Sequence, residues 1–484
     1  MIVRRGTDTL RFKTNFTIIT LRFKENPMEP EIIFKRKITE KLLKWKNESK
    51  GEKALLIEGA RRIGKSTAVE EFAKAHYRSY ILIDFNKASS IVFDNFRDNL
   101  EKLDTFFMVL SAAYGKTLYP RESLIIFDEV QTYPKARESI KYLVADGRYD
   151  FIETGSLISI KQNVRGITIP SEERKIKMYP MDFEEFVWAL GEEQLLLYIR
   201  DCFEKRIPLE RGLHERAMML FKQYMLVGGM PKALSKFLLA RKQFADCDAE
   251  KRDILVNYRD DIMKIDAQYK AKVLSIFDQI PSFLSMHEKR VRLRSIESDT
   301  NYPEYEETFF WLADSMICNE CFACSDPNVG LSLNESRAAV KCYMGDTGLL
   351  VSHAFDENEL ISEEVYVSIL SGKLSVNEGM LYENAIAQML VASGHKLYFY
   401  THYSVEKKRN DIEIDFLLSN GSKTKPKIFP IEVKSSKNYA NVSLTRFVDK
   451  FKARIGGAFI LHPKNLFVRP DGIVALPCYM AYLL

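Results

Sequence analysis

Residues 59–66, GARRIGKS, have types and spacing that suit phosphate binding. They fit the pattern G-x-x-x-x-G-K-[ST], in which glycines let backbone N–H groups approach phosphates. A helix that begins near Lys65 would aim its positive dipole end at the same place. Lys65 would reach the β- and γ-phosphates, and the Ser66 hydroxyl would ligate Mg²⁺. An ordinary strand–turn–helix connection is the alternative, but an apolar strand before the loop and an amphipathic helix after it favour phosphate binding.

Two carboxylates follow a second apolar strand, SLIIFDE (123–129). Asp128 would hold Mg²⁺ directly or through water, and Glu129 would orient and deprotonate the attacking water. Ligands of open α/β sheets bind beyond the carboxyl ends of the strands, so both motifs should converge on one crevice. The next strand ends in Thr154-Gly155-Ser156, which is either a polar sensor of the γ-phosphate or a plain turn.

Two arginines beyond this strand, Arg165 and Arg174, are candidates for an arginine finger. Such a finger stabilises transition-state charge and here would act across a subunit boundary, which requires a homo-oligomer. Because arginine is plentiful in this chain, a solvated surface arginine is the alternative for each.

The C-terminal part carries a second set of chemical side chains. Glu383 lies in a helical segment, Asp415 in the strand IEIDFLL, and Glu432 and Lys434 in FPIEVKSS. On a strand, Glu432 and Lys434 point to one face because side chains alternate with period two. Asp415 and Glu432 would share Mg²⁺, and Lys434 would orient a water or stabilise phosphorane charge, as in metal-dependent nucleases. Similar short patterns at 406–408 and 173–175 lack the preceding apolar strand.

The elements that would position these residues alternate along the chain. Apolar strands at 54–58, 80–85, 123–129 and 149–156 alternate with helical stretches at 65–76, 91–114 and 134–145. Buried strands that alternate with helices indicate a parallel sheet covered on both faces. Residues 180–245 are mostly helical, with a break at Gly228-Gly229. The C-terminal strands at 397–402, 412–418, 428–433 and 457–462 form a different α/β pattern.

Several motifs resemble one known family, the prokaryotic AAA-type ATPases that carry a restriction-endonuclease-like C-terminal domain of unknown function. The matching pieces are IEGARRIGKSTAVEEFA, LIIFDEVQ, ETGSLISI, YPMDFEEF and LVGGMPKAL. The resemblance spans about residues 31–465. It implies water activation at Glu129, sensing at Ser156 and a nuclease-like motif at Glu383, Asp415, Glu432 and Lys434. It also implies ATP contacts at Gly64, Lys65, Ser66 and Thr67, and Mg²⁺ at Asp128. With the rest of the loop pattern, the expected cofactors are ATP and Mg²⁺, with Mg²⁺ at Ser66 and Asp128. The expected nucleotide site comprises Gly59, Ala60, Arg61, Arg62, Ile63, Gly64, Lys65, Ser66 and Thr67.

The expected fold class is therefore α/β and multidomain. A basic extension (1–30) precedes an AAA-type P-loop core with a parallel sheet (31–180) and a helical lid (181–250). A winged-helix-like segment (251–354) follows, because VLSIFDQIPSFLS, FFWLADSMI and KCYMGDTGLL resemble that part of the family. A restriction-endonuclease-like α/β domain (355–484) ends the chain.

Composition limits the class of protein. The chain has 484 residues, of which 46% are hydrophobic and 12% aromatic, and a net charge of +5. These values exclude collagen-like and wholly disordered chains, and no apolar stretch reaches the ~20 residues of a membrane span. The seven cysteines form no disulfide framework, which favours a soluble protein of the reducing cytoplasm. Cys318, Cys321 and Cys324 are spaced like iron–sulfur ligands, but buried apolar cysteines are favoured over a metal site.

Two functional hypotheses follow. The first is an ATP-driven protein that acts on DNA or another nucleic acid, with nuclease activity open. The second is an ATP-dependent signalling or interaction switch with an inert C-terminal scaffold. DNA affinity that falls steeply with salt would favour the first, because phosphate contacts release counterions.

Overall fold

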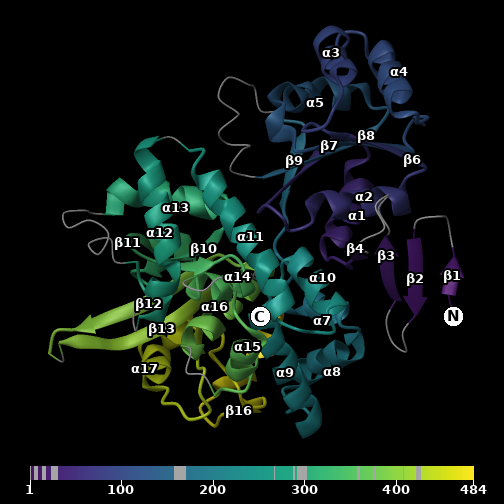
Figure 1. Ribbon diagram of the computed structural model, residues 1–484. Helices are drawn as coiled ribbons and strands as arrows, with labels where there is room; N and C mark the ends of the chain where they lie inside the picture. The colour runs from purple at the N-terminus through teal and green to yellow at the C-terminus, as the bar shows by residue number, and fades with distance from the viewer. Residues whose placement is uncertain are drawn as a thin grey trace. The chain divides into compact units, whose positions relative to one another are not determined.

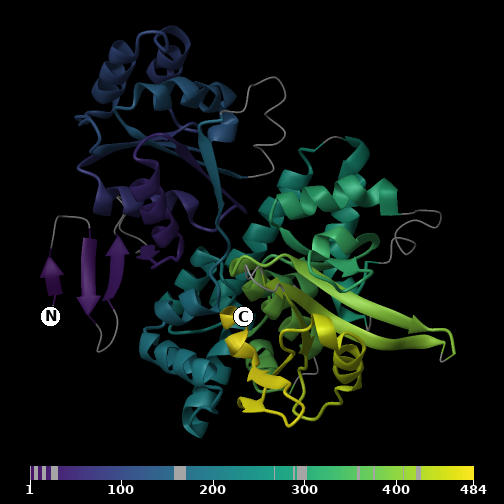
Figure 2. The ribbon, with the colours of Figure 1, turned by 180° about the vertical axis from the view of Figure 1, so that it is seen from behind.

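The computed structural model describes residues 2–4, 9–13, 18–22, 31–156, 171–265, 267–286, 289–291, 302–356, 360–373, 377–406, 408–420 and 427–484 (Figures 1 and 2). It divides into two compact units. The first, called the P-loop unit, comprises Ile33–Tyr179 and Asp314–Met316. The second, called the larger unit, comprises Met1–Ile32, Pro180–Ala313 and Ile317–Leu484.

A five-stranded parallel sheet forms the centre of the P-loop unit. The strands, in the order β6-β7-β8-β5-β9, are β6 (Ser79–Asp84), β7 (Ser123–Asp128), β8 (Asp150–Ser156), β5 (Ala54–Gly59) and β9 (Glu173–Lys177). Every residue of β5 and β7 is buried, as expected for a parallel sheet covered on both faces. The expected α/β fold is confirmed for this unit.

Helices cover this sheet. They are α1 (Ile38–Ser49), α2 (Lys65–His76), α3 (Ser90–Asp98), α4 (Leu103–Tyr114) and α5 (Pro134–Asp146). The single helical stretch expected at 91–114 is two helices, because the chain turns after Asp98 and the buried Asn95 amide donates to Phe106 O across the turn at 3.0 Å. Aromatic rings pack edge to face in the core, with the Phe96 and Phe127 centroids 5.6 Å apart.

Helices make up most of the first half of the larger unit. They are α7 (Phe183–Ala189), α8 (Glu193–Lys205), α9 (Arg211–Val227), α10 (Pro231–Leu239), α11 (Ala245–Ile262), α12 (Ala267–Ser285) and α13 (Tyr302–Asp314). The expected break between α9 and α10 is present. A Cβ at Gly229 would lie 1.9 Å from Met181 O, so the close approach of these two backbones requires glycine.

An eight-stranded mixed sheet completes the larger unit, in the order β11-β10-β12-β13-β14-β15-β17-β16 (Figure 2). Its strands are β10 (Cys318–Cys324), β11 (Glu335–Met344), β12 (Leu397–Ser404), β13 (Arg409–Asn420), β14 (Lys427–Val433), β15 (Phe459–His462), β16 (Phe467–Val468) and β17 (Val474–Pro477). The associated helices are α14 (Thr347–Ala354), α15 (Glu363–Leu370), α16 (Glu378–Ala392) and α17 (Val442–Lys450). The segment 251–354 thus contributes β10 and β11 to the same sheet as β12 to β17. This sheet therefore has strands on both sides of the expected boundary at residue 354.

The basic N-terminal extension (1–30) supplies three strands of a four-stranded sheet, a fold that was not expected from the sequence. Its strands, in the order of the sheet, are β1 (Ile2–Arg4), β2 (Thr9–Lys13), β3 (Ile18–Arg22) and β4 (Glu31–Ile33). β-branched residues in β3 favour the extended backbone, although the basic residues around them hid this pattern. Within the part of the chain described, no helix has the length and apolar character needed to cross a bilayer.

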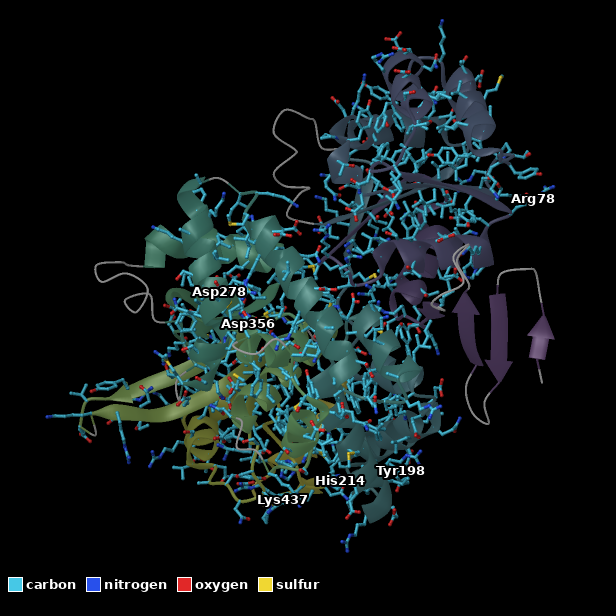
Figure 3. The ribbon with its side chains drawn as sticks, in the orientation of Figure 1. Arg78, Tyr198, His214, Asp278, Asp356 and Lys437 are labelled. Atoms are coloured by element: carbon cyan, nitrogen blue, oxygen red, sulfur yellow. The ribbon has the colours of Figure 1, made fainter. Side chains whose placement is uncertain are left out.

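Ion pairs link the helices of the larger unit at its surface. Arg259 of α11 donates to Asp278 of α12 at 3.1 Å and to Asp356, just after α14, at 2.7 Å (both aspartates are labelled in Figure 3). Exposed pairs of this kind contribute ~1 kcal/mol or less.

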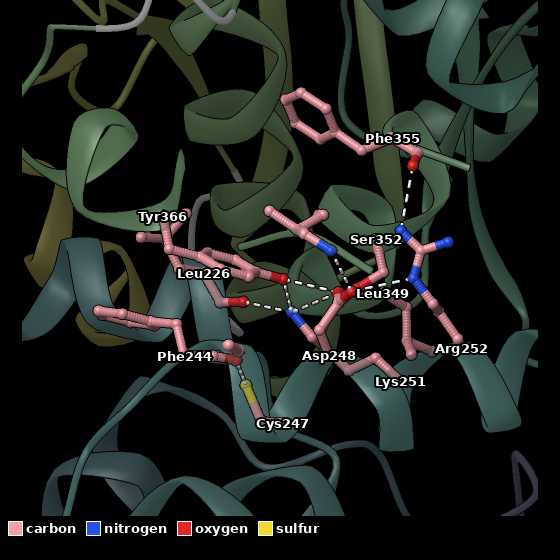
Figure 4. A network of polar contacts seen from close by, with 12 residues as sticks. Leu226, Phe244, Cys247, Asp248, Lys251, Arg252, Leu349, Ser352, Phe355 and Tyr366 are labelled. Atoms are coloured by element: carbon pink, nitrogen blue, oxygen red, sulfur yellow. Dashed lines mark hydrogen bonds and ion pairs between the residues drawn. The ribbon is translucent and has the colours of Figure 1, made fainter. Parts of the chain in front are cut away.

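Asp248 forms a stronger, buried junction between α11, α14 and α15 (Figure 4). Its Oδ1 accepts hydrogen bonds from Ser352 Oγ at 2.6 Å and Tyr366 OH at 2.8 Å, and its Oδ2 accepts one from Arg252 Nε at 2.9 Å. Burial alone would raise the pKa of Asp248, but Lys251 and these hydrogen bonds lower it below its ordinary value. The carboxylate is therefore stabilised as an anion.

Lys251 balances this buried charge. Its Nζ donates to Leu226 O at 2.9 Å and to Tyr366 OH at 2.7 Å, and lies 3.9 Å from Asp248 Oδ1. Both side chains of the Asp248–Lys251 pair are fully buried. Loss of Asp248 would leave the Lys251 ammonium inside the protein without a counter-charge.

We expect Asp248→Ala to destabilise the larger unit by about 3–5 kcal/mol, because Lys251 would remain buried without its counter-charge. Asp201→Ala is the matched control, since Asp201 also pairs with a base four residues later, Lys205, but is exposed. That change should cost about 1 kcal/mol or less. Urea unfolding followed by circular dichroism measures both, and equal losses would contradict the expectation.

Candidate functional site

The phosphate-binding pattern lies between β5 and α2. Gly59 ends β5, and α2 begins at Lys65 with Gly64 as its N-cap residue. Gly64 has φ 87°, in the left-handed region that favours glycine. The first N–H groups of α2 are free of intrahelical partners, as at any helix N-terminus, and so can bind an anion. Ser66 and Thr67 lie in this first turn.

The Lys65 side chain is buried and folded back onto the loop. Its Nζ donates to Gly59 O at 3.0 Å and to Ala60 O at 2.8 Å. Burial lowers the pKa of Lys65 to about 8, although the charges of Glu129 and Asp128 oppose the shift. An amine held by neutral carbonyls can turn to phosphate oxygens without leaving a charge unpaired.

Asp128 brings the loop and two strand ends together. It ends β7, and its Oδ1 accepts hydrogen bonds from Ser66 Oγ at 2.7 Å and from Thr154 Oγ1 of β8. Carboxylate and hydroxyl oxygens are hard donors of the kind Mg²⁺ prefers, so these residues fit that ion. Of the pair Thr154 and Ser156, the sequence analysis selected Ser156. Ser156 ends β8 beside Gly59, and its side chain lies outside the described residues.

Glu129 follows β7 in an unusual backbone conformation. Its φ of 55° is left-handed, which costs about 1–2 kcal/mol for a residue with a side chain. Its carbonyl accepts hydrogen bonds from Thr132 N at 2.9 Å and Thr132 Oγ1 at 2.8 Å, and its carboxylate accepts one from Gln131 Nε2. Strain held in place by such contacts is typical of functional sites.

Two residues at the site, Gln131 and Arg36, were not expected from the sequence. The only signal for Gln131 is its place in the matching piece LIIFDEVQ. Arg36 donates to Ile63 O and to Tyr179 O, each at 2.7 Å, and so fastens the phosphate-binding loop to the segment that follows β9. Nothing in the sequence distinguishes Arg36, because it is one of 71 lysines and arginines.

Of the two arginine-finger candidates, the structure describes Arg174, which it does not bring to this site. Arg174 lies on β9, is exposed, and donates to Glu48 of α1 at 2.9 Å. It is therefore engaged within its own unit. Arg165 lies outside the described residues.

The four C-terminal candidates lie on adjoining elements of the larger unit. Glu383 is in α16, Asp415 in β13, Glu432 in β14 and Lys434 directly after β14. Glu432 Oε1 pairs with Lys434 Nζ at 2.6 Å, and Asp415 Oδ2 accepts a hydrogen bond from Val433 N at 2.8 Å.

Two further lysines, which the sequence analysis did not select, join this cluster. Lys341 Nζ of β11 lies 3.0 Å from Glu383 Oε1 and 3.6 Å from Asp415 Oδ1. Lys289 Nζ pairs with Glu383 Oε2. Burial opposes ionisation of Glu383, but Lys289 and Lys341 outweigh it and hold the pKa of Glu383 at about 2.

The cysteines at 318, 321 and 324 lie in β10 and are buried. Cys318 and Cys321 are three residues apart, an odd number, so a strand directs them to opposite faces. In the residues that can be described, no three His, Cys, Asp or Glu side chains are grouped to hold a metal ion.

Three segments match known families. Residues 51–187 match an AAA domain. This segment is thus similar to AAA domains. Residues 218–359 match a domain of unknown function (DUF8612), and residues 378–480 match another (DUF4143). The expectation of an AAA-type P-loop domain is thereby confirmed, whereas the winged-helix-like and restriction-endonuclease-like domains stay predictions.

Solved structures show weaker similarity. The Walker-type ATPase of Pyrococcus abyssi has 15% identity and a TM-score of 0.37, with 66% of this chain and 96% of that chain covered. AMPPCP-bound DnaA from Aquifex aeolicus has 14% identity and a TM-score of 0.25, with 59% and 79% covered. Cdc6p from Pyrobaculum aerophilum has 12% identity and a TM-score of 0.26, with 69% and 93% covered. No curated protein matches the chain.

We expect the affinity of the AAA domain for ATP to fall as the pH rises above about 8. Lys65 has a pKa of about 8 in the free protein, and phosphates bind its protonated form. Binding must then take up a proton, and the dissociation constant should rise up to about tenfold per pH unit.

Titration with a fluorescent ATP analogue from about pH 7 to about pH 9 measures this dependence. Lys65→Arg is the control, because a guanidinium keeps its charge over that range. Equal affinities for the wild type at both ends of the range would contradict the expectation.

Proposed function

We propose that the P-loop unit binds ATP with Mg²⁺ and hydrolyses it. The observation that carries this proposal is the contact of Ser66 and Thr154 with Asp128, beside the buried amine of Lys65. This arrangement lies at the carboxyl edge of a parallel sheet, where open α/β sheets bind their ligands.

Binding would use the loop and the start of α2. Lys65 would exchange the carbonyls of Gly59 and Ala60 for phosphate oxygens, and backbone N–H groups from Gly64 to Thr67 would bind the same phosphates. Ser66 and Asp128 would hold Mg²⁺, which supplies positive charge against the phosphates. Arg36 would keep the loop in place.

Hydrolysis would use the residues after β7 and β8. Glu129 would orient the attacking water and take its proton. Gln131 would hold the Glu129 carboxylate in position, and Thr154 or Ser156 would respond to the γ-phosphate. Arg174 or Arg165 would act as a finger in a homo-oligomer, which for Arg174 requires release from Glu48.

We expect Lys65→Ala to abolish ATP binding and Glu129→Gln to bind ATP without turnover. The first variant loses the cation that contacts the phosphates, and the second loses only the base. Lys74→Ala is the control, because Lys74 lies on the same helix and pairs with Glu70 and Glu71 at the surface. Phosphate release and nucleotide binding are measured for each, and turnover by Glu129→Gln at the wild-type rate would rule out the assigned base.

A second proposal concerns the C-terminal part of the chain, which we propose binds DNA or another nucleic acid. Residues 378–480 contain 15 Lys/Arg and 9 Asp/Glu, an excess of six, whereas the whole chain has an excess of five. Phosphate backbones attract such a charge. An ATP-dependent interaction switch with a protein partner is the alternative function for this part of the chain.

We expect the full chain to bind DNA with an affinity that falls steeply with salt, because cation release drives phosphate binding. Arg409→Glu reverses an exposed charge at the start of β13 and should weaken binding about tenfold or less. Lys205→Glu on α8 reverses a charge outside the 378–480 segment and should leave affinity unchanged. Binding without salt dependence, or no binding at all, would favour the interaction switch.

A further inference from the structure

In the larger unit, lysine ammonium groups pair with Glu383, Asp415 and Glu432, the carboxylates of the nuclease-like motif. In a metal-dependent nuclease, such carboxylates would bind a divalent cation. We propose that Lys341, which pairs with both Glu383 and Asp415, excludes a divalent ion from these carboxylates, so that this cluster takes up neither Mg²⁺ nor Mn²⁺. The proposal rests on the nuclease-like role assigned to Glu383, Asp415 and Glu432, and it assigns the nucleic-acid function to binding without metal-assisted cleavage.

Lys341 enters the cluster from β11, a strand outside the segment that supplies the four candidates. Its side chain is only 2% exposed, and so is that of Glu383. Its Nζ lies within 4 Å of carboxylate oxygens on two different elements, at 3.0 Å from Glu383 Oε1 and 3.6 Å from Asp415 Oδ1. The ammonium thus bridges two of the candidate carboxylates, and Lys434 pairs with the third, Glu432.

Most of the other carboxylate oxygens of Glu383, Asp415 and Glu432 also contact a hydrogen-bond donor or an ammonium group. Glu383 Oε1 accepts a second hydrogen bond, from Tyr343 OH, and Glu383 Oε2 pairs with Lys289. Asp415 Oδ2 accepts from Val433 N, and Glu432 Oε1 pairs with Lys434. Glu432 Oε2 is buried without a hydrogen-bond partner, and Asp415 Oδ1 has the 3.6 Å ion pair with Lys341.

A divalent cation does not fit this arrangement. Mg²⁺ requires near-octahedral oxygen ligation at about 2.0–2.1 Å, whereas each of the three carboxylates already faces a lysine ammonium group. A cation between Glu383 and Asp415 would also lie beside a buried ammonium of the same sign. The Lys341 side chain is 2% exposed, so displacing it from the carboxylates would leave an unpaired charge in the interior.

The test compares Mn²⁺ binding to the full chain without nucleotide, by calorimetry and by thermal unfolding. We expect no Asp415-dependent Mn²⁺ binding to the wild type. Lys341→Met keeps the side-chain stem but removes the charge, so it should bind Mn²⁺. At Mn²⁺ about 100 times its dissociation constant, the melting temperature of this variant should rise by roughly 5 °C.

Two further variants assign the effect to the cluster. Adding Asp415→Asn to Lys341→Met should remove the gain. Lys396→Met is the matched control, because Lys396 also pairs with a glutamate, Glu335, but is 57% exposed. That variant should behave as the wild type. If Lys341→Met does not fold, Lys341→Gln replaces it in the same comparison.

Wild-type Mn²⁺ binding that Asp415→Asn abolishes would overturn the proposal. Failure of every folded Lys341 variant to gain Mn²⁺ binding would overturn it as well, because Lys341 would then not be what excludes the ion. DNA binding is measured on the same wild-type preparation. If the wild type binds neither DNA nor Mn²⁺, the nucleic-acid proposal is rejected, whereas the conclusion that the cluster excludes the metal ion still holds.

Discussion

The contact of Asp128 with two hydroxyls is the constraint on which the P-loop unit depends. A carboxylate at the end of a buried strand must find donors, and it finds them in Ser66 of the phosphate-binding loop and Thr154 of the next strand. This one group fixes the loop, β7 and β8 at the same edge of the sheet. The order β6-β7-β8-β5-β9 makes that possible, because β8 lies between β7 and β5. The left-handed Glu129 follows directly, so the strain at that residue is supported by the same strand end.

Buried charge sets the arrangement of the larger unit in a similar way. Asp346 is buried and accepts hydrogen bonds from Gly229 N at 2.5 Å and Leu349 N at 3.0 Å, which joins the break between α9 and α10 to the start of α14. Asp248 and Lys251 join α11 to α14 and α15. Because an unpaired charge in the interior is costly, each of these side chains specifies which elements must meet. The helices and the eight-stranded sheet are consequently parts of one unit rather than separate modules.

Local patterns predicted much of this fold. The strand β5, the helix α2 and the strand β7 begin or end within one residue of the expected positions, since buried apolar runs and a glycine-rich loop leave few alternatives. The convergence of Lys65, Ser66 and Asp128 was also predictable from strand order. Lys341 was not, because its partner Glu383 is 42 residues away in the sequence and the chain has many lysines. The pairing of β10 with β12 was missed for the same reason: parallel partners far apart in sequence leave no local signal.

Lys65 and Lys341 are both buried, one in each unit, but the acceptors around their amines differ in charge. Burial lowers the pKa of Lys65, and the acceptors of its amine are the neutral carbonyls of Gly59 and Ala60. Burial would also lower the pKa of Lys341, but Glu383 and Asp415 outweigh it and raise that pKa above its ordinary value. An amine held by carbonyls gains when an anionic phosphate arrives, because the phosphate supplies the counter-charge that burial denies it. An ammonium that already has two carboxylates gains nothing by leaving, because its charge would lose both of them. The surroundings of Lys65 therefore favour the arrival of an anion, whereas those of Lys341 favour the ion pairs that it already has.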